Sequence, residues 1–393
     1  MGALAGGPWV LVAARAVQGL GGAFLAPATL SLVTTLLPEG RERIRALSVW
    51  DGAGGAGMVL GSMLGGVLTD AFDWSAVFCV NVPMAGAGLV AAAVLLPGTA
   101  RGARGGFDLP GAVLGTASSS LPVIGLVHGP DRGWSSPVVL WSLVLAVALF
   151  ALFVVVEATS ASPLVPLGLF RNRDLSTGTA ITFLFMATFG ALAYFLTLLW
   201  QSVQGYIALA TGFAFVVPSA LALAGTFAGG RAATRIGTRA TLLVALAIST
   251  AGAVALAVMT GADRPYAAVA VPLAVLSLGQ GMVFVTMFAA ASTGVPAEDQ
   301  GIGSGIATTG RQIGGAVGLA LLIALAGAFN GTPAEGDPAG VVDGVRAAVW
   351  AIAAGIGLTA LAVLNLRRAP STISATNMAA AETAAELAGD RGL

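Results

Sequence analysis

Residues 137–157 read PVVLWSLVLAVALFALFVVVE, an apolar run of helical length that ends in a single charge, Glu157. The hydrocarbon core of a bilayer requires about 20 consecutive apolar residues of helix, and this run supplies them. The rest of the chain is of the same kind, because 57% of its 393 residues are hydrophobic and only 9% are charged. A soluble domain has about 25% charged residues, so the composition predicts an integral membrane protein.

Further long apolar runs, separated by proline, glycine and charged residues, follow one another along the chain. The alternating segments of about ten residues that mark a membrane β-barrel are not found. We therefore expect an all-α polytopic bundle of eleven membrane helices, at residues 8–36, 46–70, 75–96, 108–128, 137–157, 177–200, 207–229, 239–260, 266–292, 301–328 and 343–366.

Arginines between these helices predict the orientation of the chain, since basic residues concentrate in cytoplasmic loops. The loops on one side carry three arginines, Arg132, Arg264 and Arg346, and those on the other side carry twelve. We expect the side with twelve arginines to be cytoplasmic. The C-terminus then lies on the cytoplasmic side of the cell membrane and Met1 on the external side. The twelve are Arg41, Arg43, Arg45, Arg101, Arg104, Arg171, Arg173, Arg231, Arg235, Arg239, Arg367 and Arg368.

Several classes of function are excluded by composition and by motif searches. A net charge of zero gives no strong attraction to nucleic acid, and one cysteine and one histidine leave almost no capacity for metal binding. HExxH, GxSxG, CxxC and Walker signatures are not found, and the chain has no lysine for a P-loop. We expect no enzyme activity and no cofactor, and energy coupling that uses an ion gradient or a partner.

Two arginines lie inside predicted spans, where an unpaired charge is costly. Arg15 is followed at helical spacing by Gln18, and Arg311 by its neighbour Gln312. Each arginine could either bond to nearby carbonyl groups as a structural residue or line a polar transport pathway. We favour the pathway for Arg15, and for Arg311 the two interpretations are balanced.

Two carboxylates lie near predicted helix ends. Asp51 is five residues into its helix and could pair with a basic group or carry a proton. We favour a position at the wet cytoplasmic end, near Arg43 or Arg45. Glu157 closes its helix at the inner face, and we expect it at the membrane interface.

A stripe of glycines follows Asp51 in the helix expected at 46–70. It consists of Gly57, Gly61 and Gly65, with Gly66 adjacent. Small residues four apart let two helices approach closely in a membrane. We expect the stripe to pack against a second helix, and such a tight pair could also form a gate.

At this point three motifs together resemble the major facilitator superfamily. Leu11-x-x-x-Arg15-x-x-Gln18-Gly19-x-Gly21, with Pro27 beyond, resembles the arginine motif of that family's fourth helix. The stripe from Gly57 to Gly66 resembles the antiporter glycine motif of its fifth helix, although Ser62 stands where members usually have proline. Asn81-Val82-Pro83 resembles the start of its sixth helix.

The later chain is similar to the fourteen-helix drug:proton antiporter branch of that family. The matching stretches are Phe107-Asp108, residues 163–167, Trp200-Gln201 and Arg311-Gln312-x-Gly314-Gly315. By this resemblance the chain begins at the family's fourth helix and lacks the first three. The implied divisions are a remainder of the N-terminal bundle (1–98), two linking helices (99–175), a C-terminal six-helix bundle (176–368) and a cytoplasmic tail that we expect to be disordered (369–393).

The resemblance implies a monomeric transporter that exports hydrophobic or cationic compounds across the bilayer in exchange for protons, by alternating access. Arg15, Gln18, Asp51, Arg311 and Gln312 would form the proton and transport pathway. Two alternatives remain open, a truncated membrane protein that does not transport and a proton-coupled transporter of a small metabolite. The gating and packing residues would be Gly19, Pro27, Gly57, Gly61, Gly65, Gly66, Pro83, Gly314 and Gly315, and the residues of a substrate cavity Phe189, Tyr194 and Gln201.

Overall fold

The computed structural model describes residues 7–73, 75–96, 108–329 and 338–366. The predicted tail 369–393 lies outside these residues. Within them the regular structure is helical throughout, which confirms the all-α membrane class. The α-helices are α1 (Pro8–Leu36), α2 (Arg41–Ala71), α3 (Ala76–Leu95), α4 (Leu109–Arg132), α5 (Pro137–Thr159), α6 (Arg173–Phe189), α7 (Leu192–Leu198), α8 (Ala208–Ala214), α9 (Val216–Ile236), α10 (Thr238–Met259), α11 (Tyr266–Ala291), α12 (Gln300–Ala328) and α13 (Pro338–Val363).

Ten stretches of the described residues are long and apolar enough to cross a membrane. The eleventh expected span, at 46–70, corresponds to α2, which is not among the ten. α2 is 31 residues long, about 46 Å at 1.5 Å per residue. It begins five residues earlier than predicted because a search for apolar runs passes over the charged first turn that contains Arg41 and Glu42.

Two expected spans are interrupted helices. Residues 173–203 consist of α6, α7 and a π-helical turn at Leu199–Val203, and residues 208–236 consist of α8 and α9. Gly190 directly follows the last residue of α6. A Cβ added at Gly190 would meet the carbonyl of Met186 and would lie 3.4 Å from Cα of Gly315 in α12. Hydropathy does not register such breaks because the residues on both sides of them remain apolar.

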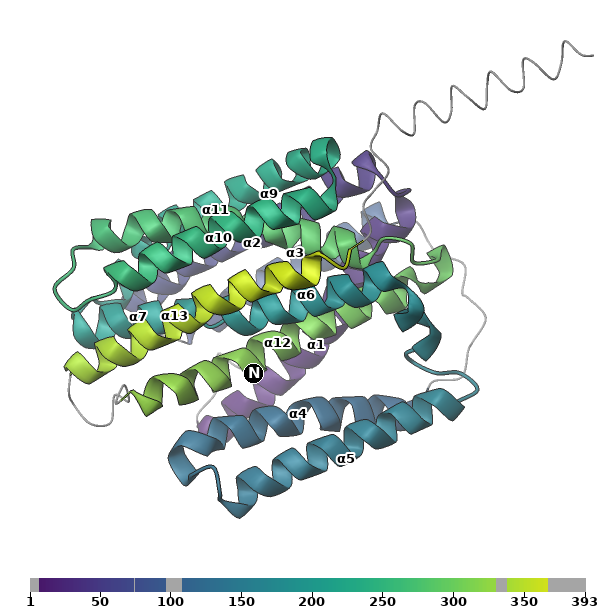
Figure 1. Cartoon of the computed structure of the whole chain (residues 1–393), viewed down its shortest axis with the longest axis horizontal. Coiled ribbons are helices and arrows are strands. Elements are labelled where there is room, and N and C mark those ends of the chain that lie inside the picture. The colour runs from purple at the N-terminus through teal and green to yellow at the C-terminus, as the bar shows by residue number, and fades with distance from the viewer. Residues whose placement is uncertain (1–6, 74, 97–107, 330–337, 367–393) are drawn as a thin grey trace, which may run out of the picture.

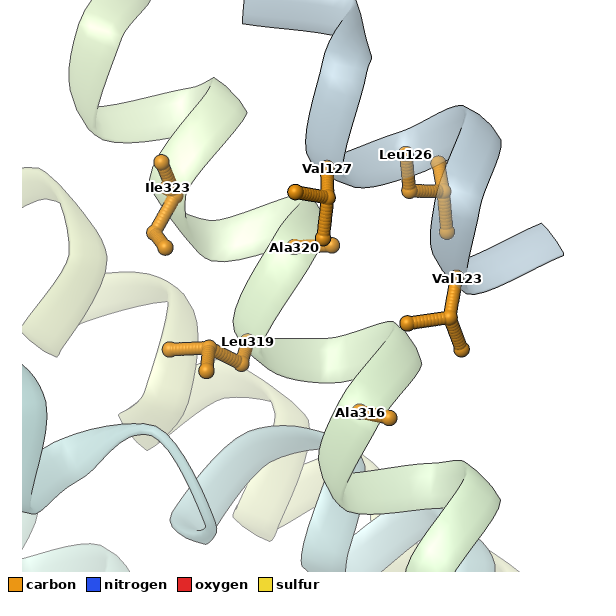
Figure 2. A pocket seen from close by; sticks show the side chains of 7 residues that line it. All are labelled: Val123, Leu126, Val127, Ala316, Leu319, Ala320 and Ile323. Carbon is orange, nitrogen blue, oxygen red and sulfur yellow. The ribbon is translucent and has the colours of Figure 1, made fainter. Parts of the chain in front are cut away.

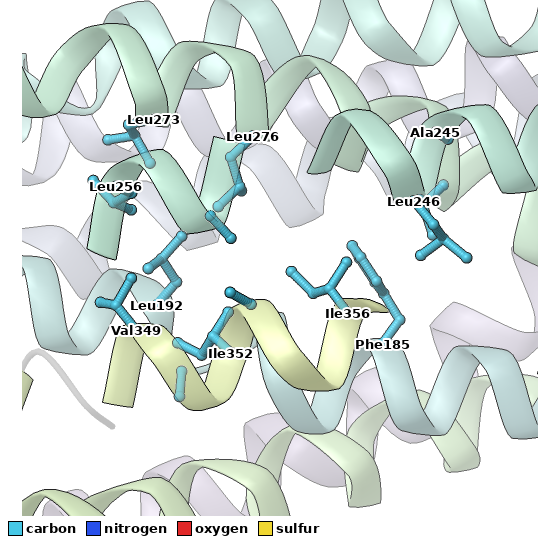
Figure 3. Packing of buried hydrophobic residues seen from close by; sticks show 14 of the residues in the cluster. Phe185, Leu192, Ala245, Leu246, Leu256, Leu273, Leu276, Val349, Ile352 and Ile356 are labelled. Carbon is cyan, nitrogen blue, oxygen red and sulfur yellow. The ribbon is translucent and has the colours of Figure 1, made fainter. Parts of the chain in front are cut away.

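The buried core lies mainly in the second part of the chain, where α6, α7, α10, α11 and α13 pack together (Figures 1 and 3). Phe185, Leu246, Leu276 and Ile356 are among its fully buried side chains. By contrast α3 has no buried residue. The hairpin of α4 and α5 lies at one edge of the bundle and reaches the remainder through α12 (Figure 1).

Glycines hold the core helices close together, but they are not the glycines of the predicted stripe. An added Cβ at Gly225, Gly229 or Gly281 would meet the backbone across the α9–α11 contact. At Gly57, Gly61 and Gly65 it would meet nothing within 4 Å, so the expected tight helix pair is not formed there.

The reason lies in the faces of α2. At about 100° per residue, Gly57, Gly61 and Gly65 lie on the face opposite to Gly52. A Cβ added at Gly52 would lie 3.0 Å from the ring of Phe227 of α9. Gly66 lies on the same side as Gly52, and a Cβ added there would lie 3.2 Å from Leu209 of α8. The glycine-poorer face of α2 is therefore the one that packs against α8 and α9.

Candidate functional site

Asp51 joins α2 to α9 through a hydrogen bond. The Oγ1 hydroxyl of Thr226 donates to Oδ2 of Asp51 at 2.8 Å. Thr226 is 3% exposed, and Asp51 is half-buried. The expected position of Asp51 beside Arg43 or Arg45 is therefore wrong, because the carboxylate faces Thr226 of α9.

The same hydroxyl also reaches two carbonyl oxygens. Oγ1 of Thr226 lies 3.3 Å from the carbonyl of Ala222 in its own helix and 3.3 Å from that of Gly281 in α11. This triple contact depends on Gly281, because an added Cβ there would collide with the carbonyl of Ala222. Three helices, α2, α9 and α11, thus meet at one hydroxyl group.

Arg311 adds a fourth helix to this site. Its guanidinium, half-buried on α12, interacts electrostatically with Asp51. Nε of Arg311 is buried without a hydrogen-bond partner. Arg311 and Asp51 do not form a direct ion pair, so they attract each other across a gap.

This arrangement can register the protonation state of Asp51. A hydroxyl has one hydrogen to donate and can donate it to one acceptor at a time. While Asp51 is ionised, that hydrogen points to the carboxylate and ties α9 to α2. Once Asp51 carries a proton, the carboxyl O–H can donate to Thr226, whose own hydrogen is then free to turn to the carbonyl of Gly281 or Ala222.

A second polar cluster, here called the latch, joins the turn between α1 and α2 to the turn between α11 and α12. It consists of Glu39, Arg43, Asn172 and the turn Ser292–Gly294. Oε1 of Glu39 accepts from the backbone N–H of Gly294 at 2.7 Å, and Nη1 of Arg43 donates to the carbonyl of Ser292 at 3.5 Å. Nδ2 of Asn172 donates to the carbonyl of Gly294 at 2.7 Å.

The latch lies at the end of the bundle that carries the arginine-rich loops. Arg43 forms an ion pair with Glu39 at 3.7 Å and donates a hydrogen bond to the carbonyl of Leu37 at 2.9 Å. It does not pair with Asp51. The latch connects the start of α2 and the turn before it to the turn between α11 and α12. The Asp51 site connects α2 to α9.

Arg15 and Gln18 do not join either cluster. Nη1 of Arg15 donates to Oε1 of Gln18 at 2.8 Å, and both side chains are exposed on α1. An added Cβ at Gly19 would meet nothing within 4 Å. Pro27 and Pro83 lie inside α1 and α3.

The residues beside Arg311 have separate surroundings. Gln312 is exposed, whereas Gly314 lies against the carbonyl of Phe183 and Gly315 would place a Cβ 3.7 Å from Cε of Met186. These two glycines let α12 pack closely on α6. They therefore hold the part of α12 that carries Arg311 close to α6.

The three residues expected in a substrate cavity make different contacts. Phe189 stacks on Phe185 with ring centroids 5.4 Å apart. Tyr194 is 43% exposed and lies edge-on to Phe195 at 5.3 Å. Nε2 of Gln201 donates to Oγ1 of Thr211 at 3.3 Å.

Figure 2 shows a pocket elsewhere, between α4 and α12, lined by apolar side chains. None of the site residues expected from the sequence lines it. The side chains that line it carry no polar group that could orient a ligand.

Comparison with known proteins finds one family and several relatives whose names concern drug export or resistance. The profile of the Major Facilitator Superfamily matches residues 1–319. The cephamycin export protein CmcT of Amycolatopsis lactamdurans is 36% identical over 345 residues, which cover 85% of this chain and 70% of that protein.

Two further relatives are longer than the region they share with this chain. The tetracenomycin C resistance and export protein of Streptomyces glaucescens is 31% identical over 81% of this chain and 59% of its own length. The multidrug resistance protein Stp of Mycobacterium tuberculosis is 32% identical over 80% of this chain and 58% of its own length. The chain thus spans somewhat under two thirds of the length of these two relatives.

Proposed function

We propose, from the premise that this chain belongs to the Major Facilitator Superfamily, that it exports hydrophobic or cationic drug-like compounds across a bacterial cell membrane. Support comes from relatives named as antibiotic export and multidrug resistance proteins. We assign the chain to the fourteen-helix branch of the family and regard it as a monomer. The arginine-rich end of the bundle is taken as cytoplasmic, in accordance with the charge bias of the loops.

Export is driven by exchange for protons at Asp51. The observation that carries this proposal is the hydrogen bond from Thr226 to Asp51, with Arg311 attracted to the same carboxylate. A proton that enters from outside binds Asp51, and the hydroxyl of Thr226 turns from α2 toward the carbonyl of Gly281. The contact between the two bundles weakens, the proton leaves to the cytoplasm, and one substrate molecule moves in the opposite direction.

Alternating access then requires that the two ends of the bundle open in turn. The latch supports a state in which the arginine-rich end is closed, because Glu39 and Arg43 hold the turn between α11 and α12. Release of the latch would open that end to the cytoplasm. Arg15 and Gln18 tune the proton step from α1.

The test uses everted bacterial membrane vesicles that contain the chain, with ethidium as a cationic dye. When the vesicle interior is acidified, dye should accumulate, and a protonophore should abolish the accumulation. Asp51→Asn should remove the proton dependence, whereas Glu298→Gln, at an exposed carboxylate, should behave as the unchanged protein.

The alternatives give different results in the same vesicles. No dye accumulation by correctly folded protein would favour a membrane protein that does not transport. Uptake of a labelled metabolite instead of dye would favour a metabolite transporter. Accumulation that survives Asp51→Asn would reject the role of that carboxylate.

A further inference from the structure

The apolar pocket between α4 and α12 lies at the edge of the bundle, where the α4–α5 hairpin meets α12 (Figures 1 and 2). Figure 2 shows Val127 of α4 beside Ala320 of α12. Both helices are long and apolar enough to cross the membrane, and Val127, which lines the pocket, is 54% exposed. The pocket therefore opens to the hydrocarbon of the bilayer.

The hairpin holds one wall of this pocket in place. A Cβ added at Gly115 would lie 3.3 Å from the ring of Phe153 in α5, and one added at Gly125 would meet the hydroxyl of Ser142. At the end of α5, Glu157 is 3% exposed, so it is buried within the protein and not exposed at the membrane interface as expected. Close packing of α4 on α5 thus fixes the face that α4 turns to α12.

The size and lining of the pocket suit a single apolar ring. Its volume is about 180 Å³, and every side chain that lines it is that of valine, leucine, isoleucine or alanine. An apolar cavity of about 150 Å³ in another protein stays free of water and binds benzene. An uncharged aromatic group is therefore a ligand that this pocket can hold.

Polar side chains stand one helical turn from the pocket on both helices. At about 100° per residue, Gln312 shares a face of α12 with Ala316 and Ile323, and Ser120 shares a face of α4 with Val127. Both polar side chains are exposed.

These two polar groups lie near the middle of their helices. At 1.5 Å per residue, Gln312 is about 18 Å from the start of α12 and about 24 Å from its end. Ser120 is about 17 Å from the start of α4 and about 18 Å from its end. An exposed amide at this depth is costly in hydrocarbon unless it has a hydrogen-bond partner.

This arrangement distinguishes two classes of ligand. A phospholipid carries its polar group at the membrane surface, so its acyl chain brings nothing polar to the depth of Gln312. A compact compound with one apolar ring and one hydrogen-bonding group can fill the pocket and bond to the amide at the same time. We propose that the groove between α4 and α12 binds uncharged aromatic compounds dissolved in the bilayer, with the ring in the pocket and the polar group at Gln312.

The groove is separate from the Asp51 site. Arg311 interacts with Asp51, and its neighbour Gln312 stands about 100° further around α12, on the face of the groove. Gly314 lies between them and the pocket and packs on α6. Binding in the groove requires no proton and no transport, so this proposal does not rest on the proposed export function.

Photolabelling of the full chain in lipid nanodiscs, without a proton gradient, tests the site. The probe is the benzyl alcohol derivative of trifluoromethyl phenyldiazirine, which has one ring and one hydroxyl group. Peptide mapping by mass spectrometry should place its adducts within residues 120–127 and 312–323. This labelling should saturate and should be displaced by an excess of unlabelled benzyl alcohol.

Variants separate the pocket from the lipid-facing surface. Val123→Phe fills the pocket and should reduce the labelling severalfold. Val144→Phe, the same change at an exposed position of α5, should leave it unchanged. If Val123→Phe folds poorly, Ala316→Phe fills the pocket from α12.

A second probe tests the polar end of the site. Gln312→Leu should weaken binding of the alcohol by about twofold to tenfold, the factor expected for one hydrogen bond. Plain trifluoromethyl phenyldiazirine has no hydroxyl group and should bind equally to both proteins. An equal effect on the two probes would overturn the role of Gln312.

Labelling of the pocket that does not saturate, or that is no stronger than labelling around Val144, would show that acyl chains fill the groove. That result would overturn the proposal. Equal losses in the pocket-filling variant and in Val144→Phe would overturn it as well.

Discussion

The bond from Thr226 to Asp51 gives the sharpest prediction. Thr226→Val removes the hydroxyl but keeps a β-branched side chain of similar size in the buried site. The lost bond has a donor–acceptor distance of 2.8 Å and an acceptor that is a carboxylate. Hydrogen bonds to charged groups contribute about 1.5–3 kcal/mol.

That free energy sets the size of the effect. If the bond holds α2 against α9, local opening of α2 should become more frequent by about 10-fold to 150-fold, since 1.4 kcal/mol corresponds to about a factor of ten. Hydrogen exchange of the amides around Asp51, followed by mass spectrometry in lipid nanodiscs, measures this opening.

The matched control is Thr226→Ser, which retains the hydroxyl and should exchange nearly as the unchanged protein does. Exchange in Thr226→Val that stays within a factor of two of the unchanged protein would show that this bond does not hold α2 against α9. Equal acceleration in both variants would assign the effect to packing instead of to the bond.

Three further predictions concern the remaining contacts. Gly281→Ala should lower the midpoint of thermal unfolding by several degrees, because the new Cβ meets the carbonyl of Ala222 and overpacking costs about 1–3 kcal/mol. Gly57→Ala, where the new Cβ has nothing within 4 Å, should leave the midpoint unchanged or raise it. Equal effects of the two substitutions would show that close packing at Gly281 is not the cause. In a Cys79→Ser background, Glu39→Ala should increase maleimide labelling of Thr293→Cys by releasing the latch, and the neighbouring exposed Glu42→Ala should not. Arg15→Ala should abolish proton-driven dye accumulation in everted vesicles, and undiminished accumulation would remove Arg15 from the proton pathway.

Most of the membrane helices can be predicted from hydropathy alone. The span at 239–260 is observed as Thr238–Met259, and that at 266–292 as Tyr266–Ala291. A charged first turn, as at Arg41, is missed because it is not part of an apolar run. A break within apolar sequence, as at Gly190, is missed because it leaves the mean hydropathy of a window unchanged.

The candidate site was only half predictable. Asp51 and Arg311 are conspicuous in the sequence because charges in apolar helices are costly. Thr226 gives no such signal, since a threonine in a membrane helix commonly bonds to its own backbone. Its partner Asp51 is 175 residues away, and only the packing of α2 on α9 brings them together.

The glycines and the two buried carboxyl groups of the α4–α5 hairpin show the same division. Spacing alone selected Gly57, Gly61 and Gly65, but the orientation of α2 turns that face away from its neighbours and leaves close packing to Gly225, Gly229 and Gly281. Likewise the sequence places Asp108 and Glu157 at helix ends, and the antiparallel α4–α5 hairpin buries both beside Gly111.

The membrane class, the helix positions and the family resemblance can be predicted from the amino-acid sequence, because they depend on apolar length and local spacing. The tertiary structure decided which polar groups meet. A helix fixes the spacing of its own side chains, but its rotation and its neighbours are set by packing across the whole bundle.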